Sequence, residues 1–101
     1  MPFYTTVRAR LKDADQRAAM EAHNAVVARL QPRNAELGGV GHRVYANVED
    51  PREFLAMDTW ESMEGLQQAF GDPETQREIG SLFEGPPQVT IWSVREGWTA
   101  F

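Results

Sequence analysis

Hydrophobic and polar residues alternate in four short segments of the chain, and this two-residue period predicts four β-strands. The expected strands are Phe3–Leu11, Val40–Val48, Phe54–Trp60 and Val89–Val94. They are rich in β-branched and aromatic residues, which strands favour. Asp50-Pro51 lies between the second and third strands and suits the first two positions of a type I turn. We therefore expect the central pair to form a β-hairpin.

Between the strands, apolar residues recur at helical spacing instead. The expected helices cover residues 13–30, 62–70 and 72–84. Asp13 or Asp15 can cap the first helix and Ser62 the second, and Asp72 followed by Pro73 is a typical helix start. Pro32 is expected to end the first helix, because proline removes a backbone donor from the helix. The apolar tail after the last strand, 97–101, is expected to pack on something.

The order β-α-β-β-α-β predicts an α+β fold, the ferredoxin-like split βαβ, with one antiparallel sheet and both helical layers on one face. At 101 residues, the chain is expected to form a single domain, 1–101. Val, Leu, Met or Trp also occupy the other face in at least three strands. Such a face needs a second cover, most simply the same sheet of a second copy, so we expect a homodimer that forms a dimeric α+β barrel.

The pairing of the hairpin strands stays open, because a shift of one residue moves every side chain to the other face. In one register, Val48 lies opposite Phe54. His42 then shares a face with Asp58. In the register shifted by one residue, Arg43 lies opposite Asp58. We favour the second, because it gives the Asp58 carboxylate a cation.

The composition excludes several classes of function. The formal net charge of −5 argues against a nucleic-acid partner, and no apolar run is long enough to span a membrane, so a cytoplasmic location is expected. Cysteine is absent, which removes disulfides, thiolate nucleophiles and Cys-based metal sites. No phosphate-binding loop or His-Glu-x-x-His motif occurs, and the two histidines lack metal-ligand spacing. We expect no metal and no cofactor.

Three ionisable side chains stand out as candidates for chemistry. His42 lies in a strand among valines, and imidazole is the side chain best suited to move protons near neutral pH. His23 lies on the apolar stripe of the first helix and could face a pocket between helix and sheet. Asp58 has apolar neighbours, so it needs a partner if it is half-buried. Each of the three also has a structural interpretation. For the histidines it is a packed side chain, and for Asp58 it is an ion pair with Arg43 or a hydrogen bond to a tyrosine or histidine.

Aromatic residues could line an apolar pocket beside these groups. Trp60, Phe54, Tyr45 and Trp92 are the candidates, although sheet aromatics are more commonly plain core. In an enzyme, His42 would be the base, Arg43 or Tyr45 would stabilise a developing oxyanion, and Trp60 with Phe54 would hold an aromatic ring.

The stretch from Gly39 to Trp60, with Asp58 two positions before the tryptophan and a helix after Glu61-Ser62, resembles the antibiotic-biosynthesis-monooxygenase-like dimeric α+β-barrel family. The likeness extends to Asp72-Pro73-Glu74 and Gly85-Pro86-Pro87. It implies a pocket lined by the late-strand tryptophan, which Trp60 matches. An asparagine four residues earlier in that family is replaced here by Ala56.

The resemblance implies a cofactor-free monooxygenase that acts on a small aromatic or polyketide-like molecule. In the family's oxygenases, the deprotonated polyphenol passes electrons directly to O₂. The family also contains isomerases, cyclases and proteins without assigned chemistry. A non-catalytic small-molecule-binding dimer and a cofactor-free isomerase or cyclase are therefore the alternatives.

Overall fold

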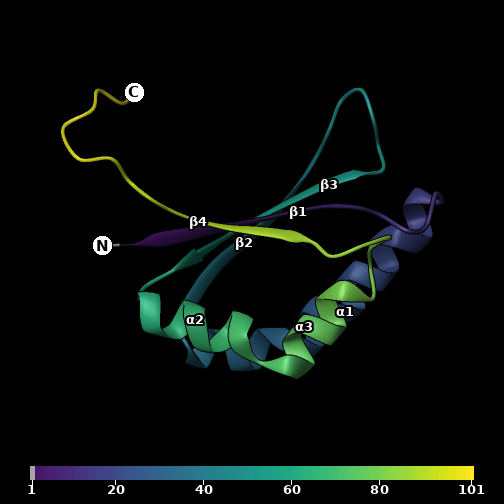
Figure 1. Cartoon of the computed structure of the whole chain (residues 1–101), viewed down its shortest axis with the longest axis horizontal. Helices are drawn as coiled ribbons and strands as arrows, with labels where there is room; N and C mark the ends of the chain where they lie inside the picture. The colour runs from purple at the N-terminus through teal and green to yellow at the C-terminus, as the bar shows by residue number, and fades with distance from the viewer. Residues whose placement is uncertain (1) are drawn as a thin grey trace.

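The computed structural model describes residues 2–101 and places three helices on one face of a four-stranded antiparallel sheet (Figure 1). The elements are β1 (Phe3–Arg10), α1 (Gln16–Glu36), β2 (Gly39–Ala46), β3 (Glu53–Trp60), α2 (Met63–Gly71), α3 (Pro73–Gly80) and β4 (Gln88–Ser93). This confirms the predicted α+β, ferredoxin-like order, with the second helical layer divided between α2 and α3.

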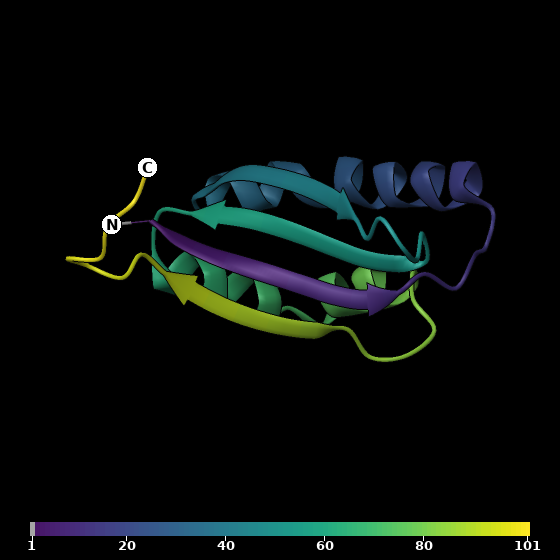
Figure 2. The ribbon, with the colours of Figure 1, turned by 90° about the horizontal axis from the view of Figure 1, so that it is seen from above.

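The strands lie side by side in the order β2-β3-β1-β4 (Figure 2). In the same view, α1 runs along the β2 side of the sheet, and α2 and α3 lie under β1 and β4. The helices therefore cover one face of the sheet, α1 over its β2 half and the α2–α3 pair over its β1–β4 half.

Two buried clusters make up the core under the helices. Val7, Phe54 and Leu82 belong to the larger one. Trp60 and Leu66 anchor the smaller one near α2. The division matters for function, because residues of both clusters line the cavity described below.

The predicted helix starts are confirmed by their capping hydrogen bonds. Asp15 Oδ1 accepts from two backbone N–H groups of the first turn of α1. Ser62 Oγ accepts from Gly65 N, and Asp72 Oδ1 accepts from Glu74 N. Each cap satisfies a backbone donor that has no partner within its own helix.

The start of α2 packs very closely on the end of α1. A Cβ atom on Gly65 would lie 1.8 Å from the carbonyl oxygen of Leu37, which no side chain can tolerate. Glycine at this position therefore sets how near the two helices lie. It also fixes where Ala69 and Phe70, four and five residues later, meet the cavity.

The prediction that Pro32 ends the first helix is wrong, because α1 continues through it to Glu36. Proline removes only one hydrogen bond from the helix, and the following turn is still closed by the bond from Leu37 N to Arg33 O. Asn34 in that turn lines the cavity. The chain leaves the helix at Gly38, whose φ of +92° is strained for any other residue.

The hairpin is confirmed, but the favoured register is wrong. Ala46 lies opposite Phe54 and His42 opposite Asp58. The side chains therefore face the same sides of the sheet as in the first alternative, although the pairing is shifted by two residues. The reason lies in the loop. Asn47 Oδ1 accepts from Glu49 N, and Glu53 N donates to Asp50 O in the expected turn. These bonds take residues 47 and 48 out of β2.

The tail does not pack on this chain. After β4, it runs away from the sheet (Figure 1), and Trp98 and Phe101 are exposed. Arg95 lies over the Trp98 ring, 5.2 Å from its centroid. The expected packing partner is therefore not within the described residues.

Among the helices of residues 2–101, none combines the length and the apolar character needed to cross a membrane.

Candidate functional site

A cavity of about 230 Å³ lies between the sheet and the helices. α1, β3, the first residues of β2, the end of α2 and α3 all contribute to its wall. Its lining is mostly apolar and includes Phe54, Trp60, Phe70 and Leu82. Because an apolar cavity of about 150 Å³ holds a benzene molecule, this one has room for a small fused-ring compound.

The polar side of the cavity is built on neighbouring strands. Residues directly opposite each other in an antiparallel pair share a face, so the register places His42 of β2 beside Asp58 of β3. His42 Nδ1 lies 2.5 Å from Asp58 Oδ1. The Asp58 side chain is 17% exposed and that of His42 is 34% exposed, so the pair lies at the rim of the cavity and not deep within it.

Asp58 is held from the central strand as well. Thr5 of β1 lies opposite Asp58 and donates its hydroxyl hydrogen to Asp58 Oδ2 at 3.3 Å. Trp60 Nε1 donates in turn to Thr5 Oγ1 at 3.3 Å. Both Asp58 oxygens are therefore engaged, and the carboxyl group is fixed in orientation toward His42.

His23 of α1 faces His42 across the cavity rim. Their Nε2 atoms are 3.1 Å apart, and their rings stack with centroids 5.2 Å apart and an angle of 16°. His23 Nδ1 lies 3.0 Å from Asn24 Oδ1 at the surface. A continuous line of hydrogen bonds thus runs from the buried Trp60 ring through both imidazoles to an exposed amide.

Five of the seven predicted site residues meet at this cavity: His23, His42, Phe54, Asp58 and Trp60. The prediction that Asp58 pairs with Arg43 is wrong. Arg43 lies opposite Met57 and Tyr45 opposite Leu55, so both belong to the other face of the sheet. They cannot stabilise an oxyanion formed beside His42.

The prediction that Trp92 lines this pocket is also wrong. It lies opposite Tyr4, on the outer face, where its Nε1 donates to Thr6 Oγ1. This prediction fails for the same reason as that for Tyr45, because the register of the strands decides on which face of the sheet each side chain lies.

Sequence reasoning missed Thr5, Asn24, Gln31 and Asn34. Gln31 and Asn34 line the cavity from α1. They follow His23 at intervals of eight and eleven residues, so they fall on the same helical stripe, and that spacing could have identified them. Thr5 and Asn24 carried no such signal, since they act only through neighbours brought close by the fold.

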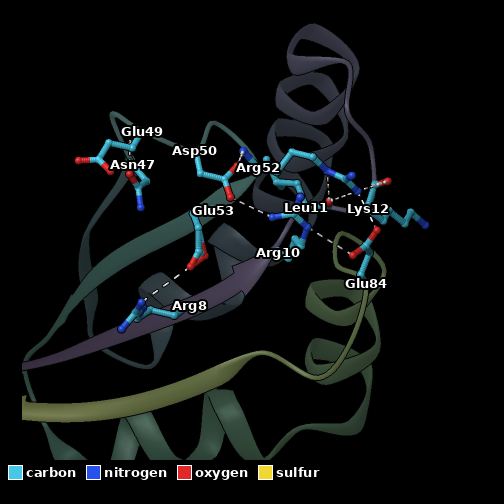
Figure 3. A network of polar contacts seen from close by, with 10 residues as sticks. All are labelled: Arg8, Arg10, Leu11, Lys12, Asn47, Glu49, Asp50, Arg52, Glu53 and Glu84. Carbon is cyan, nitrogen blue, oxygen red and sulfur yellow. Dashed lines mark hydrogen bonds and ion pairs between the residues drawn. The ribbon is translucent and has the colours of Figure 1, made fainter.

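A second polar cluster lies at the end of β1, beside the β2–β3 turn (Figure 3), and none of its residues lines the cavity. Arg52 donates to the carbonyl oxygens of Leu11 and Lys12 and to Glu84 Oε1, at 2.8–3.1 Å. Arg10 pairs with Asp50 at 3.0 Å. The Arg52 backbone N–H, and after it the Arg10 guanidinium, hold the pKa of Asp50 below its ordinary value.

Within residues 2–101, no group of three or more His, Cys, Asp or Glu side chains is arranged so that it could hold a metal ion. The cavity itself offers an Asp-His couple, a second histidine and aromatic walls. Such a set can bind an aromatic ring and transfer a proton to or from it.

No protein-family model matches the chain, and no curated protein sequence does. Solved structures of similar fold do exist. One is a protein from Bordetella bronchiseptica that is named as an antibiotic biosynthesis monooxygenase. It has 18% identity and a TM-score of 0.69, over 93% of this chain and 97% of that one. SnoaB, a cofactor-independent oxygenase from Streptomyces nogalater, has 15% identity and a TM-score of 0.68, over 94% of each chain. A conserved protein from Methanosarcina mazei has 11% identity and a TM-score of 0.72, over 94% of each chain.

At these identities the comparisons establish a shared fold. The resemblance to antibiotic-biosynthesis-monooxygenase-like proteins, inferred from the sequence, is confirmed at that level. The fold hosts more than one chemistry, so activity has to be argued from the site.

Proposed function

We propose that the protein binds a small hydroxylated aromatic molecule in the cavity and acts on it as a cofactor-free monooxygenase. The observation that carries this proposal is the His42–Asp58 couple at the edge of an apolar cavity lined by Phe54 and Trp60. The shared fold with a cofactor-independent oxygenase supports it.

In this mechanism, the aromatic walls hold the ring and the couple takes a proton from its hydroxyl group. Asp58 accepts from His42 Nδ1, which leaves Nε2 as the basic nitrogen on the cavity side. Thr5 and Trp60 keep Asp58 in place, and Asp58 in turn holds the His42 ring in one orientation.

The ligand anion is the electron donor in the second step. It passes one electron to O₂, and the resulting radical and superoxide combine into a ring peroxide anion. The protonated His42 returns its proton to this anion, which becomes a hydroperoxide. Loss of water then leaves a quinone carbonyl, so one oxygen atom enters the product and the other leaves as water. For anthrone, one O₂ converts the ring methylene group into a carbonyl group and releases one water.

One observation favours a second candidate, a non-catalytic binder. Both ring nitrogens of His42 are already engaged, Nδ1 by Asp58 and Nε2 by His23. A base needs a free lone pair, so catalysis requires the ligand to separate the two imidazoles. An isomerase or cyclase would use the same base without O₂.

Oxygen uptake with hydroxynaphthalenes and anthrone, combined with mass spectrometry of the product, tests the proposal. We expect turnover that survives chelators and needs no added flavin or nicotinamide. The matched variant is His42→Gln, which keeps a polar group in place but cannot act as a base. Binding without oxygen consumption above buffer would leave the binder, and product without oxygen uptake would point to isomerase or cyclase chemistry.

We propose further that two copies associate through their outer sheet faces. Tyr45, Met57 and Trp92 are 45%, 37% and 54% exposed there, and no helix of residues 2–101 covers that face (Figure 1). Such an apolar surface is typical of an interface. Sedimentation at micromolar concentration should give a dimer, and Met57→Glu should give a monomer. A wild-type mass of 11.4 kDa would contradict this.

A further inference from the structure

Two side-chain amides of α1 belong to the cavity wall beyond the two histidines. Asn34 follows His23 by eleven residues, which is close to three full helical turns, so both side chains lie on the same face of α1. Val27 and Leu30 lie between them on that face, and all four residues line the cavity. Helix α1 therefore places an imidazole at one end of its part of the wall and an amide at the other.

The amide end adjoins the buried tryptophan. Gly39, the first residue of β2, lies between Asn34 and Trp60, since a Cβ atom on it would be 3.0 Å from the Asn34 carbonyl oxygen and 3.3 Å from Trp60 Cζ3. The last turn of α1 thus lies directly against the start of β2 and the Trp60 ring. Gln31 precedes Asn34 by three residues, and side chains at that spacing are neighbours on a helix surface. Gln31 is the more exposed of the two, so it lies nearer the mouth of the cavity.

Both amides are available to a ligand. Asn24 and Asn47, the other asparagines of the chain, are engaged in polar contacts with their own neighbours. Asn34 and Gln31 make no side-chain hydrogen bond within residues 2–101. Every buried side-chain nitrogen or oxygen in that range has a partner, so these two amides are open to whatever enters the cavity. A carboxamide offers one acceptor and two N–H donors.

The amide end and the histidine end are one small molecule apart. Gly39 at the amide end lies opposite Trp60. His42 lies opposite Asp58, two residues earlier on β3. Two residues of an antiparallel strand span about 7 Å, which is close to the separation of two hydroxyl groups at opposite ends of a naphthalene. A two-ring ligand therefore has the length to contact both ends at once.

The amide end carries no charge of its own. The ionisable residues of the cavity lining are the two histidines and Asp58, which belong to the other end. Arg33 follows the same turn of α1, but its Nη1 lies 3.4 Å from Asp72 Oδ2, so its charge is already paired. A ligand carboxylate held here would lose water without gaining a cation, and this is costly. A neutral group that donates or accepts a hydrogen bond suits the amides instead.

We infer that Asn34 and Gln31 form a second binding subsite, which holds a neutral hydroxyl or carbonyl group at the end of the ligand opposite to the end that meets His42. Asn34 makes the hydrogen bond, and Gln31 offers a second amide to the same group from the mouth. The ring system lies against Trp60 between the two polar ends. An apolar ring alone could enter the cavity in either direction, whereas the amides favour one of them.

This inference rests on the proposed binding of an aromatic ligand and assigns the residues that decide its orientation. It concerns binding only, and no proton or electron is transferred at the amides. A ligand with the same rings but no polar group at the far end is expected to bind more weakly.

Calorimetric titration of the whole chain with three naphthalenes tests the subsite. 2-Naphthol has one hydroxyl group, 2,6-dihydroxynaphthalene adds a neutral hydroxyl group at the opposite end, and 6-hydroxy-2-naphthoic acid has a carboxylate there. We expect the diol to bind about 5- to 20-fold more tightly than 2-naphthol, since its two equivalent orientations give a factor of two and one net hydrogen bond gives the rest. The acid should bind no more tightly than 2-naphthol.

Two results of this titration would overturn the inference. One is a gain of twofold or less for the diol, and the other is an acid that binds as tightly as the diol. Failure of all three compounds to bind would instead overturn the proposed function.

Replacement of the amides separates the subsite from the rest of the cavity. Asn34→Leu keeps the shape of the side chain without its hydrogen bonds, so the preference for the diol should fall to the twofold value that symmetry gives, while 2-naphthol still binds. Gln31→Leu should lower the preference by a smaller factor. Gln67→Leu makes the same exchange at an exposed position of α2 outside the cavity and should keep the full preference. An Asn34→Leu variant that binds 2-naphthol yet retains the wild-type preference would overturn the inference.

Discussion

Charged side chains gather at two places in this molecule, and the two clusters differ in what surrounds them. The Arg10–Arg52 cluster at the far end of the sheet ties the end of β1, the β2–β3 turn and the segment after α3 together (Figure 3). The histidine–aspartate cluster, formed by His23, His42 and Asp58, borders the cavity. Both join segments distant in sequence.

The difference lies in the use of their donors. The Arg52 guanidinium donates hydrogen bonds to two carbonyl oxygens and a carboxylate, which are fixed partners within the protein. The two histidines contact each other at the rim of the cavity, where a ligand can reach them. Donors that are all bonded to fixed partners within the protein indicate a structural role, while a polar contact at the rim of an apolar cavity indicates a functional one.

The largest expected effect is on activity, at His42. Replacement by Ala should slow turnover by about 10²- to 10⁴-fold, the range for loss of a positioned general base. The free energy of unfolding should change little, because His42 is partly exposed. Oxygen uptake and urea melts measured on the same preparation check both parts. A large loss of stability would show that His42 has a structural role. The histidine–aspartate cluster would then not differ in role from the Arg10–Arg52 cluster.

Asp58 should affect both quantities. Asp58→Ala removes the acceptor of His42 Nδ1 and of the Thr5 hydroxyl, and it should cost about 1–3 kcal/mol of stability. Turnover should fall as well, because the imidazole loses its fixed orientation. Asp58→Asn is the matched control that keeps the shape. A urea melt unchanged in both variants would show that Asp58 is solvated.

Arg52 should affect stability alone. Arg52→Met keeps much of the side-chain volume but leaves the Leu11 and Lys12 carbonyls without their donor, at a cost of about 1–3 kcal/mol. Binding of 2-naphthol should stay the same, since the cluster lies away from the cavity. Altered naphthol affinity in a folded variant would show that the two clusters communicate.

Asp50 should give the structural cluster a pH dependence. Its pKa is lowered in the folded state, so its contribution is complete above the ordinary value of 3.8 and is lost as the pH falls through the folded value. Thermal melts at neutral and acidic pH should show a smaller acid-induced loss of stability for Asp50→Asn than for wild type. Equal acid sensitivity would place the responsible carboxylate elsewhere.

The smallest effect is expected at Arg17, whose ion pair with Glu21 lies on the exposed side of α1. Arg17→Ala should change stability by about 0–0.5 kcal/mol, as surface pairs one helical turn apart usually do. This pair belongs to neither cluster and does not line the cavity, so the stability change of Arg17→Ala serves as the baseline for the other variants. A change comparable to that of Arg52→Met would show that exposure is a poor guide in this protein.

The sequence by itself determined the elements and their order. Alternation and helical spacing are local properties, so the strands, the helix starts at Asp15, Ser62 and Asp72, and the ferredoxin-like arrangement could all be read from the chain. The same patterns identified His42, Asp58 and Trp60 as unusual, because a polar or aromatic residue within an alternating strand stands out without any structure.

Only the tertiary structure decided which of these residues meet. Strand faces depend on register, and register here depends on hydrogen bonds within the 47–53 loop that alternation does not encode. That single choice moved Arg43 and Tyr45 to the outer face and brought His42 to Asp58. The contact between His23 and His42 joins a helix to an edge strand, and the packing of α1 on the sheet places the two imidazoles within one hydrogen bond of each other.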